Sequence, residues 1–190
     1  MNLLSQSSSI VKRLPIHTPR AQTIKRLLLL NSAAYAAYLL SSGPAKLAHK
    51  SHFTAAPNST FESLFLFHFS HTNLLQFLFT STVFYTVGNY HIAAYGATHF
   101  FTLFGASAIG GTALTGLGLK SGQTDIYQAG AMAPAAGLIT YNVFRNPGWF
   151  KMFLRPVPLL AAIAFYGALY NDRAALGGLG ASYLAFIFGI

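Results

Sequence analysis

Residues 127–144 read YQAGAMAPAAGLITYNVF, an apolar stretch of helical length in the last third of the chain. Small residues recur every four positions along it, at Ala129, Ala133 and Gly137. Residues four apart share one face of an α-helix, and small side chains on such a face let the backbone of a second helix approach closely. The stretch therefore predicts a helix that packs tightly against a neighbour.

A second stretch, residues 174–190 (AALGGLGASYLAFIFGI), has the same spacing. Its small residues are Gly177, Ala181, Ala185 and Gly189. Two stripes of this kind are typical of helices that associate within a membrane. We predict that the two stretches form helices in direct contact through these faces.

The composition of the chain points to a membrane protein. Of its 190 residues, 53% are hydrophobic and 8% are charged, whereas an ordinary soluble domain carries about 25% charged residues. The net charge of +9 would suit a nucleic-acid-binding protein, but the basic residues flank apolar segments, so orientation in a membrane explains them better. There is no cysteine, which excludes disulfides and thiolate metal sites. We expect an all-α, polytopic membrane protein that does not bind nucleic acid.

Six apolar segments are candidates for membrane-spanning helices, which need roughly 20 mostly apolar residues. Glycine, proline and polar residues separate them, as is typical of loops. We expect a single membrane domain over residues 27–190. Its predicted spans are residues 27–41, 62–84, 91–113, 127–144, 156–170 and 174–190.

The basic residues are distributed unevenly between the two sides of this six-span arrangement. One side carries most of the Lys and Arg residues, whereas the other carries fewer, together with Glu62, Asp125 and Asp172. An excess of basic residues marks the cytoplasmic or matrix side of a membrane, so we expect the N-terminus on that side. The basic residues of that side are Lys12, Arg13, Arg20, Lys25, Arg26, Arg145, Lys151 and Arg155.

Residues 1–26 form a basic segment that contains several serines and no acidic residue. This composition is typical of a mitochondrial targeting segment, and the alternative is a plain basic cytoplasmic tail. We favour the mitochondrial interpretation. It places the protein in the mitochondrial inner membrane with residues 1–26 as a tail on the matrix side.

Beyond these patterns, the chain resembles the rhomboid family of intramembrane proteases over residues 55–190. That family has a six-helix core with its N-terminus on the cytoplasmic or matrix side. It has a histidine in helix two, a Gly-x-Ser-Gly-type turn at the start of helix four, and a histidine in a glycine-patterned helix six. Here STFESLFLFHFSHTNLL places His68 at the helix-two histidine. GAMAPAAG places Gly130 and Gly137 at the helix-four glycines, and AALGGLGASYLAFIFG resembles helix six.

The resemblance fails at the residues that carry the family's chemistry. Met132 occupies the position of the nucleophilic serine, and Ala175 (or Ala174, if the alignment moves by one residue) occupies that of the histidine. The positions that resemble the oxyanion donors fall on Asn73 and Phe77. Acyl transfer needs a nucleophile, a base and donors to the oxyanion, so we expect no enzymatic activity.

Four histidines, His68, His71, His91 and His99, fall in or beside the predicted spans. An ionisable residue there marks a haem, metal or proton site, or it hydrogen-bonds a neighbouring helix. No acidic residue lies well inside a span with these histidines, since Glu62 is the first residue of its span, and a metal-bound histidine usually needs such a second partner. We therefore favour hydrogen bonding and expect no metal or cofactor. The spacing of three between His68 and His71 predicts a shared helical face.

Other polar residues of the spans leave two possibilities open. Ser70 lies beside two of the histidines and is a second candidate nucleophile, but neither an acid nor an oxyanion hole accompanies it, as a catalytic constellation would require. The amides of Asn73, Gln76 and Asn142 would suit the lining of a path through the membrane. Such amides more often hydrogen-bond across helices, and we favour that role.

The function that we expect is structural: a non-catalytic, rhomboid-like accessory subunit of a mitochondrial inner-membrane complex. Among such complexes we favour a respiratory-chain complex or ATP synthase. Its partners would be other membrane subunits and phospholipids, with cardiolipin bound at Arg145, Lys151 and Arg155. An alternative is a pseudoprotease that binds client membrane helices, for example with a protein translocase. The third possibility is an active intramembrane serine protease.

Overall fold

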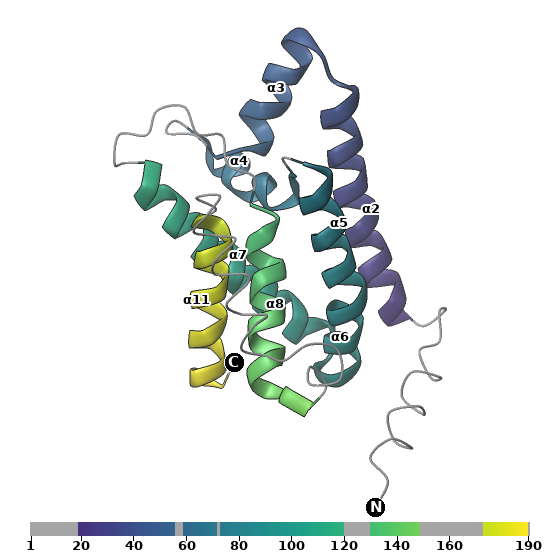
Figure 1. Ribbon diagram of the computed structural model, residues 1–190, viewed down its shortest axis with the longest axis vertical. Helices are drawn as coiled ribbons and strands as arrows, with labels where there is room; N and C mark the ends of the chain where they lie inside the picture. Colours follow the sequence, from purple (N-terminus) through teal and green to yellow (C-terminus); the bar gives the residue numbers. More distant parts are fainter. Residues whose placement is uncertain (1–18, 56–58, 72, 120–129, 149–172, 190) are drawn as a thin grey trace, which may run out of the picture.

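The computed structural model describes residues 19–55, 59–71, 73–119, 130–148 and 173–189. Figure 1 shows an elongated bundle of helices, and no β-strand occurs in the ranges described. The all-α class predicted from the sequence is therefore confirmed. In chain order the elements are α2 (Pro19–Leu40), α3 (Gly43–Phe53), α4 (Phe61–Leu66), the 3₁₀ turn η1 (Phe67–Phe69), α5 (Leu74–Val83), the π-helical turn η2 (Phe84–Gly88), α6 (Asn89–Tyr95), α7 (Ala97–Leu119), α8 (Met132–Arg145) and α11 (Arg173–Phe188).

Helix α2 packs antiparallel to α5, η2 and α6 (Figure 1). Near the N-terminal end of α2, Ile24 fills the space beside Gly88. A Cβ atom added at Gly88 would lie 2.9 Å from Ile24 Cδ1. Near its other end, the Tyr35 ring stacks on Phe77 with centroids 4.7 Å apart. The helix starts at Pro19 rather than at residue 27, because the intervening Arg, Gln and Lys are good helix formers. Its inward face consists of Ile24, Leu27, Asn31, Ala34 and Tyr35.

Helix α3 continues from the end of α2 and none of its residues is buried. It carries Lys46 and Lys50 and no acidic residue. The Lys46 ammonium lies 4.9 Å from the centroid of the Tyr38 ring, and His49 stacks on Phe53. Partial burial lowers the pKa of His49 below its ordinary value.

The predicted second span, residues 62–84, is wrong in its boundaries because the chain breaks in the middle of it. Helix α4 and η1 end at residue 69, and a new helix begins at Leu74. The Asn73 side chain accepts a hydrogen bond from the Gln76 N–H at 2.8 Å and caps that helix. Asparagine competes in this way for backbone groups and favours helix starts. The helix then continues through η2 and α6, so residues 74–95 form one helical run.

Gly96 separates this run from α7. Its φ of 90° lies in the left-handed region, where glycine is the favoured residue, and it ends α6. Helix α7 begins at the next residue. The predicted third span, residues 91–113, therefore combines the last turn of one helix with most of another.

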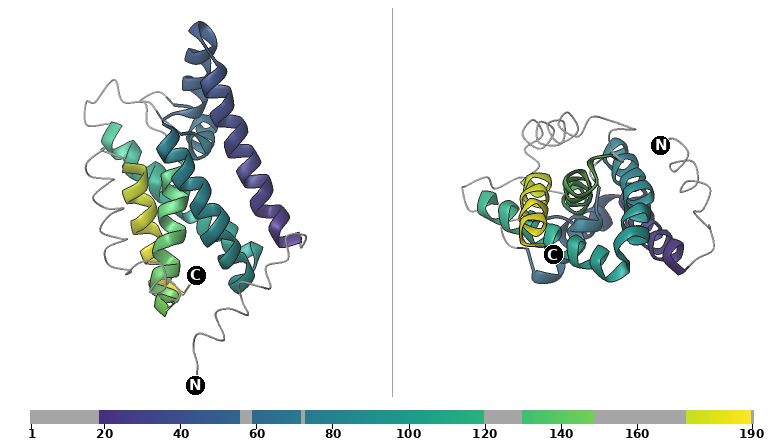
Figure 2. Two further views of the ribbon diagram at one scale, coloured as in Figure 1. Left: turned by 45° about the vertical axis from the view of Figure 1, so that its right-hand side comes forward. Right: turned by 90° about the horizontal axis from the view of Figure 1, so that it is seen from below.

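Helix α8 is the central element of the fold. Every residue from Met132 to Val143 is buried, and Figure 2 shows α8 between α11 on one side and the α5–α6 run on the other. Helix α11 packs against both α7 and α8. These three helices form the most closely packed part of the bundle.

Small residues make this packing possible, although not with the pairing predicted from the sequence. A Cβ atom at Gly178 would collide with the backbone of Ala133, so Gly178 is the α11 residue that faces α8. Gly177 and Ala181 instead face α7, where a Cβ atom at Gly110 would lie 2.5 Å from that of Ala181. The assignment of Gly177 and Ala181 to the α8 contact is therefore corrected. Adjacent positions on a helix point about 100° apart, which is enough to change the partner.

The remaining small residues of the two predicted stripes have different positions. On α8, a Cβ atom at Gly137 would lie 2.5 Å from Ser182 Oγ on α11. Ala185 is buried in the main apolar core, whereas Gly189 follows the end of α11 with a φ of 72°. Ala129 lies outside the described residues.

By length and composition, one described helix can cross a membrane: residues Ala97–Leu117 of α7. Helix α11 is apolar but shorter. The predicted fifth span, residues 156–170, lies outside the described part of the chain. The six-span count is therefore not confirmed.

The substitution Gly178→Ala should destabilise the bundle, because the added methyl group would meet the backbone of Ala133. Overpacking of this kind costs about 1–3 kcal/mol, and the midpoint of thermal unfolding in detergent should fall by several degrees. Gly105→Ala is the matched control, since no atom lies within 4 Å of the added carbon and alanine is the better helix former. An equal fall in both variants would contradict the close contact.

Candidate functional site

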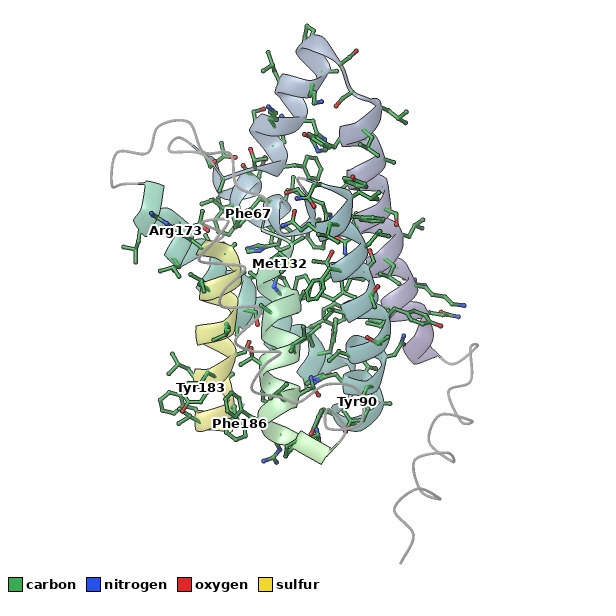
Figure 3. All side chains as sticks on the ribbon, viewed as in Figure 1. Phe67, Tyr90, Met132, Arg173, Tyr183 and Phe186 are labelled. Carbon is green, nitrogen blue, oxygen red and sulfur yellow. The ribbon has the colours of Figure 1, made fainter. Side chains whose placement is uncertain are left out.

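The two positions that resemble the rhomboid dyad lie at the start of α8 and α11. Met132 is the first residue of α8, close to Phe67 in Figure 3, and both Met132 and Ala175 are buried. A Cβ atom added at Gly111 of α7 would lie 2.5 Å from Ala133 Cβ and 3.1 Å from the Ala174 carbonyl oxygen. The three helices therefore meet here with no space between their backbones for a further side chain.

His68 joins η1 to both α7 and α8 at this level. Its Nδ1 lies 3.2 Å from the Gly130 carbonyl oxygen, and its Nε2 lies 2.9 Å from Thr112 Oγ1. Both ring nitrogens therefore have a hydrogen-bond partner, and the ring also has a backbone hydrogen bond with Ala108 of α7. His68 acts as a link between helices.

Gly130 completes this junction. Its N–H donates to the Phe67 carbonyl at 2.8 Å, and a Cβ atom at this position would collide with the Phe67 ring. The glycine predicted from the rhomboid resemblance thus lets η1 dock against the start of α8.

The Ser70 and His71 pair does not form a nucleophile and base. The Ser70 hydroxyl donates to the Phe67 carbonyl at 2.8 Å, whereas His71 Nε2 lies 2.6 Å from Thr80 Oγ1. The predicted shared face of His68 and His71 is also wrong. The 3₁₀ turn ends at residue 69, so His71 follows a change in chain direction and points toward α5 and α2.

The two residues at the predicted oxyanion positions belong to a different interface. Asn73 caps α5, as described above, and Phe77 lies between the rings of Tyr35 and His71. Gln76, the third polar residue of this segment, is buried. The structure therefore directs Phe77 toward α2, and it uses the Asn73 oxygen to cap α5.

A chain of hydrogen bonds joins α6, α7 and α8 near the other end of α8. His91 Nδ1 lies 3.2 Å from Asn142 Oδ1 and 3.0 Å from Asn142 Nδ2. His91 Nε2 lies 2.9 Å from His99 Nδ1, and His99 Nε2 lies 3.2 Å from the Tyr141 hydroxyl. The Tyr95 ring packs against both histidines.

The hydrogens of this chain must all point the same way, because each neutral imidazole has one N–H and one acceptor nitrogen. In one pattern Tyr141 donates to His99, His99 to His91, and His91 to the Asn142 carbonyl. The amide N–H of Asn142 then donates to the Leu138 carbonyl at 2.7 Å. In the reverse pattern that amide donates to His91. Both patterns pair every ring nitrogen, which allows two histidines to be held together inside the bundle as neutral groups. Among the described residues, no third histidine or carboxylate joins this pair.

Asn31 is a candidate residue that no motif marks. It is fully buried, and neither atom of its amide has a hydrogen-bond partner among the described residues. The contacts of Ile24 with Gly88 and of Tyr35 with Phe77 place Asn31 level with Ser81, whose buried hydroxyl is also without a partner. The sequence signal for this residue is an amide, Asn31, that directly follows four leucines at residues 27–30.

The basic residues proposed for cardiolipin are only partly described. Arg145 ends α8 and is exposed, whereas Lys151 and Arg155 lie outside the described residues.

Comparison of the chain with protein-family models, with curated proteins and with solved structures finds no match. The rhomboid resemblance therefore stays a prediction.

The substitution Asn142→Leu should lower the free energy of unfolding by about 1–3 kcal/mol, because it leaves His91 Nδ1 buried without a partner. Thermal unfolding in detergent measures the effect. Thr102→Val is the control, since that exposed hydroxyl bonds only within its own helix and such surface changes stay within about 0.5 kcal/mol. Equal stability of the two variants would exclude a structural role for the histidine chain.

Proposed function

We propose that this protein is embedded in a membrane and has a structural, non-catalytic role. The observation that supports this best is that polar side chains lie inside the bundle while many large apolar side chains face outward. Polar residues such as His68, His91 and Asn142 are buried, whereas large apolar residues such as Phe61 and Phe188 are exposed. A soluble protein rarely exposes large contiguous apolar surface, while polar residues inside a membrane bundle turn toward its interior.

Helix α2 shows both features within a single element. Asn31 lies on its inward face at 0% exposure, whereas Leu29 and Leu40 are 70% and 86% exposed. Water would favour the opposite arrangement. In the hydrocarbon of a membrane this arrangement is stable. An exposed leucine carries no free-energy penalty there, and an amide is more favourable between helices than against lipid.

The arrangement that we propose has six spans: α2, residues 74–95, α7, α8, residues 156–170 and α11. Helix α2 has 22 residues, which at 1.5 Å per residue gives about 33 Å, close to the hydrocarbon thickness of about 30 Å. Helix α8 has 14 residues, and its burial among other helices suits a span too short to face lipid. In this arrangement we place the N-terminus on the matrix side of the mitochondrial inner membrane.

A rhomboid-like scaffold without proteolysis is the second part of the proposal. Neither Met132 nor Ala175 has a group that attacks a carbonyl or takes a proton, and the hydrogen bonds of His68 serve to join helices. The small residues around them support close helix contact. A scaffold of this kind suits an accessory subunit of a respiratory-chain complex or ATP synthase, with phospholipids such as cardiolipin around Arg145, Lys151 and Arg155.

A handler of client membrane helices is the alternative, because the exposed apolar faces would suit transient helix contacts as well as permanent ones. The two roles differ in stoichiometry. A fixed subunit co-purifies at a constant ratio in mild detergent, whereas a client handler is substoichiometric and exchanges.

Native-gel migration of mildly solubilised membranes tests the subunit role. We expect the protein only in one high-mass band, because a fixed subunit stays with its partners in mild detergent. A stable free band near its own mass of 20.5 kDa would overturn that role.

The double substitution Met132→Ser with Ala175→His should not restore proteolysis, because the Phe77 ring has no hydrogen-bond donor and stacks on Tyr35, and the cap fixes Asn73 at the start of α5. Labelling by a serine-directed activity probe is the measurement, with the unchanged protein as the reference. Labelling of the unchanged protein would refute the non-catalytic proposal directly. Labelling of the double variant alone would show that the oxyanion is stabilised by other groups.

A further inference from the structure

The first turns of α2 combine two basic residues with an outward apolar face. Lys25 and Arg26 are both exposed, and Leu29 and Leu30 follow one turn later at 70% and 50% exposure. Residues three and four apart lie on the same face of a helix. The charged end and the apolar surface of α2 are therefore continuous.

This end of α2 lies beside η2 and α6. Ile24 packs against Gly88, the residue directly before α6. It is also the end at which α8 terminates, since His91 of α6 is joined to Asn142 near the end of α8. Arg145 thus adds a third positive charge to the same end of the bundle. The acidic residue that the structure describes, Glu62, lies in α4 toward the opposite end (Figure 1).

The dimensions of the face fit one leaflet of a bilayer. Half of a hydrocarbon core of about 30 Å corresponds to roughly ten helical residues. Counted from Arg26, ten residues reach Ala36, and the positions between them include exposed Leu29, Leu30 and Ala33. An acyl chain lying along this face would end near the middle of the membrane.

We propose that the outward face of α2 binds an anionic phospholipid, with its phosphate at Lys25 and Arg26 and an acyl chain along Leu29 and Leu30. The inference rests on the proposed membrane location and adds a ligand at residues separate from Arg145, Lys151 and Arg155. Arginine binds phosphate through two parallel N–H donors, and lysine adds a point charge. Each basic residue near an anionic bilayer surface strengthens binding by about fivefold.

An acidic protein segment is the other partner that would complement this charge. The lipid is favoured because the positive charge stands at the end of an exposed aliphatic surface, and a phospholipid supplies both the phosphate and the acyl chain. A protein segment would have to supply an acidic residue and a separate apolar helix at matching positions.

The experiment uses the full chain, purified in mild detergent and transferred to nanodiscs of phosphatidylcholine that contain a minor fraction of cardiolipin or phosphatidylglycerol. Native mass spectrometry after release from the disc counts the retained lipids. The variant is Lys25→Gln with Arg26→Gln. The matched control, Lys46→Gln with Lys50→Gln, removes the same charge from α3 at the opposite end of α2.

We expect the unchanged protein and the control to retain the anionic lipid in preference to phosphatidylcholine. The α2 variant should lose this preference by about 10-fold or more, as the removal of two basic contacts implies. Its unfolding midpoint in pure phosphatidylcholine should match that of the unchanged protein, which shows that folding is intact.

Equal retention by the α2 variant, or an equal loss in the control, would overturn the lipid site. Retention that disappears only when a co-purifying protein is removed would assign the face to an acidic protein partner instead. Recovery of the chain in the soluble fraction after carbonate extraction would overturn the membrane proposal and the lipid site together. A membrane-embedded chain without lipid preference would overturn the lipid site alone.

Discussion

The close approach of α7, α8 and α11 is the constraint on which the rest of the bundle depends. The Gly178 backbone meets the backbone of Ala133, and the Gly111 backbone meets the methyl group of Ala133. This proximity brings Thr112 of α7 and Gly130 at the start of α8 within reach of one histidine, His68. A larger residue at any of these glycines would separate the helices and remove a hydrogen-bond partner as well as a packing contact.

Helix α8 is held by histidines at both of its ends. At the start, His68 and the Phe67 carbonyl engage Gly130, and near the finish Asn142 engages His91. In the membrane location that we propose, a hydrogen bond between helices contributes only about 0.6–2 kcal/mol. Packing of the apolar and small residues therefore supplies most of the stability, while the histidines fix the height and rotation of α8 relative to its neighbours.

The sequence was sufficient for the helical class and for the use of small residues in packing, because both follow from composition and spacing. It was insufficient for the pairing of faces, since Gly177 and Gly178 are adjacent and only the positions of α7 and α8 decide which glycine serves which contact. The break before Leu74 was also missed. The apolar pattern runs through it, and the capping role of Asn73 becomes decisive only when the chain has a place to turn.

Residues outside any motif were the hardest to predict. Thr112 is one of several hydroxyl residues in α7, and only its contact with His68, distant in the chain, distinguishes it. Residues 74–95 illustrate the same limit, because neighbours on two sides align them. The run meets α2, as through Phe77 and Tyr35, and it also meets α8, as through His91 and Asn142.

The π-helical turn η2 lies between these two contacts, and each of its hydrogen bonds encloses one residue more than in an α-helix. One residue corresponds to about 100° of rotation. The number of residues in this segment, independent of their identity, therefore sets the angle at which His91 enters the bundle. A deletion of one residue would act on α8 as strongly as a change to the histidine itself.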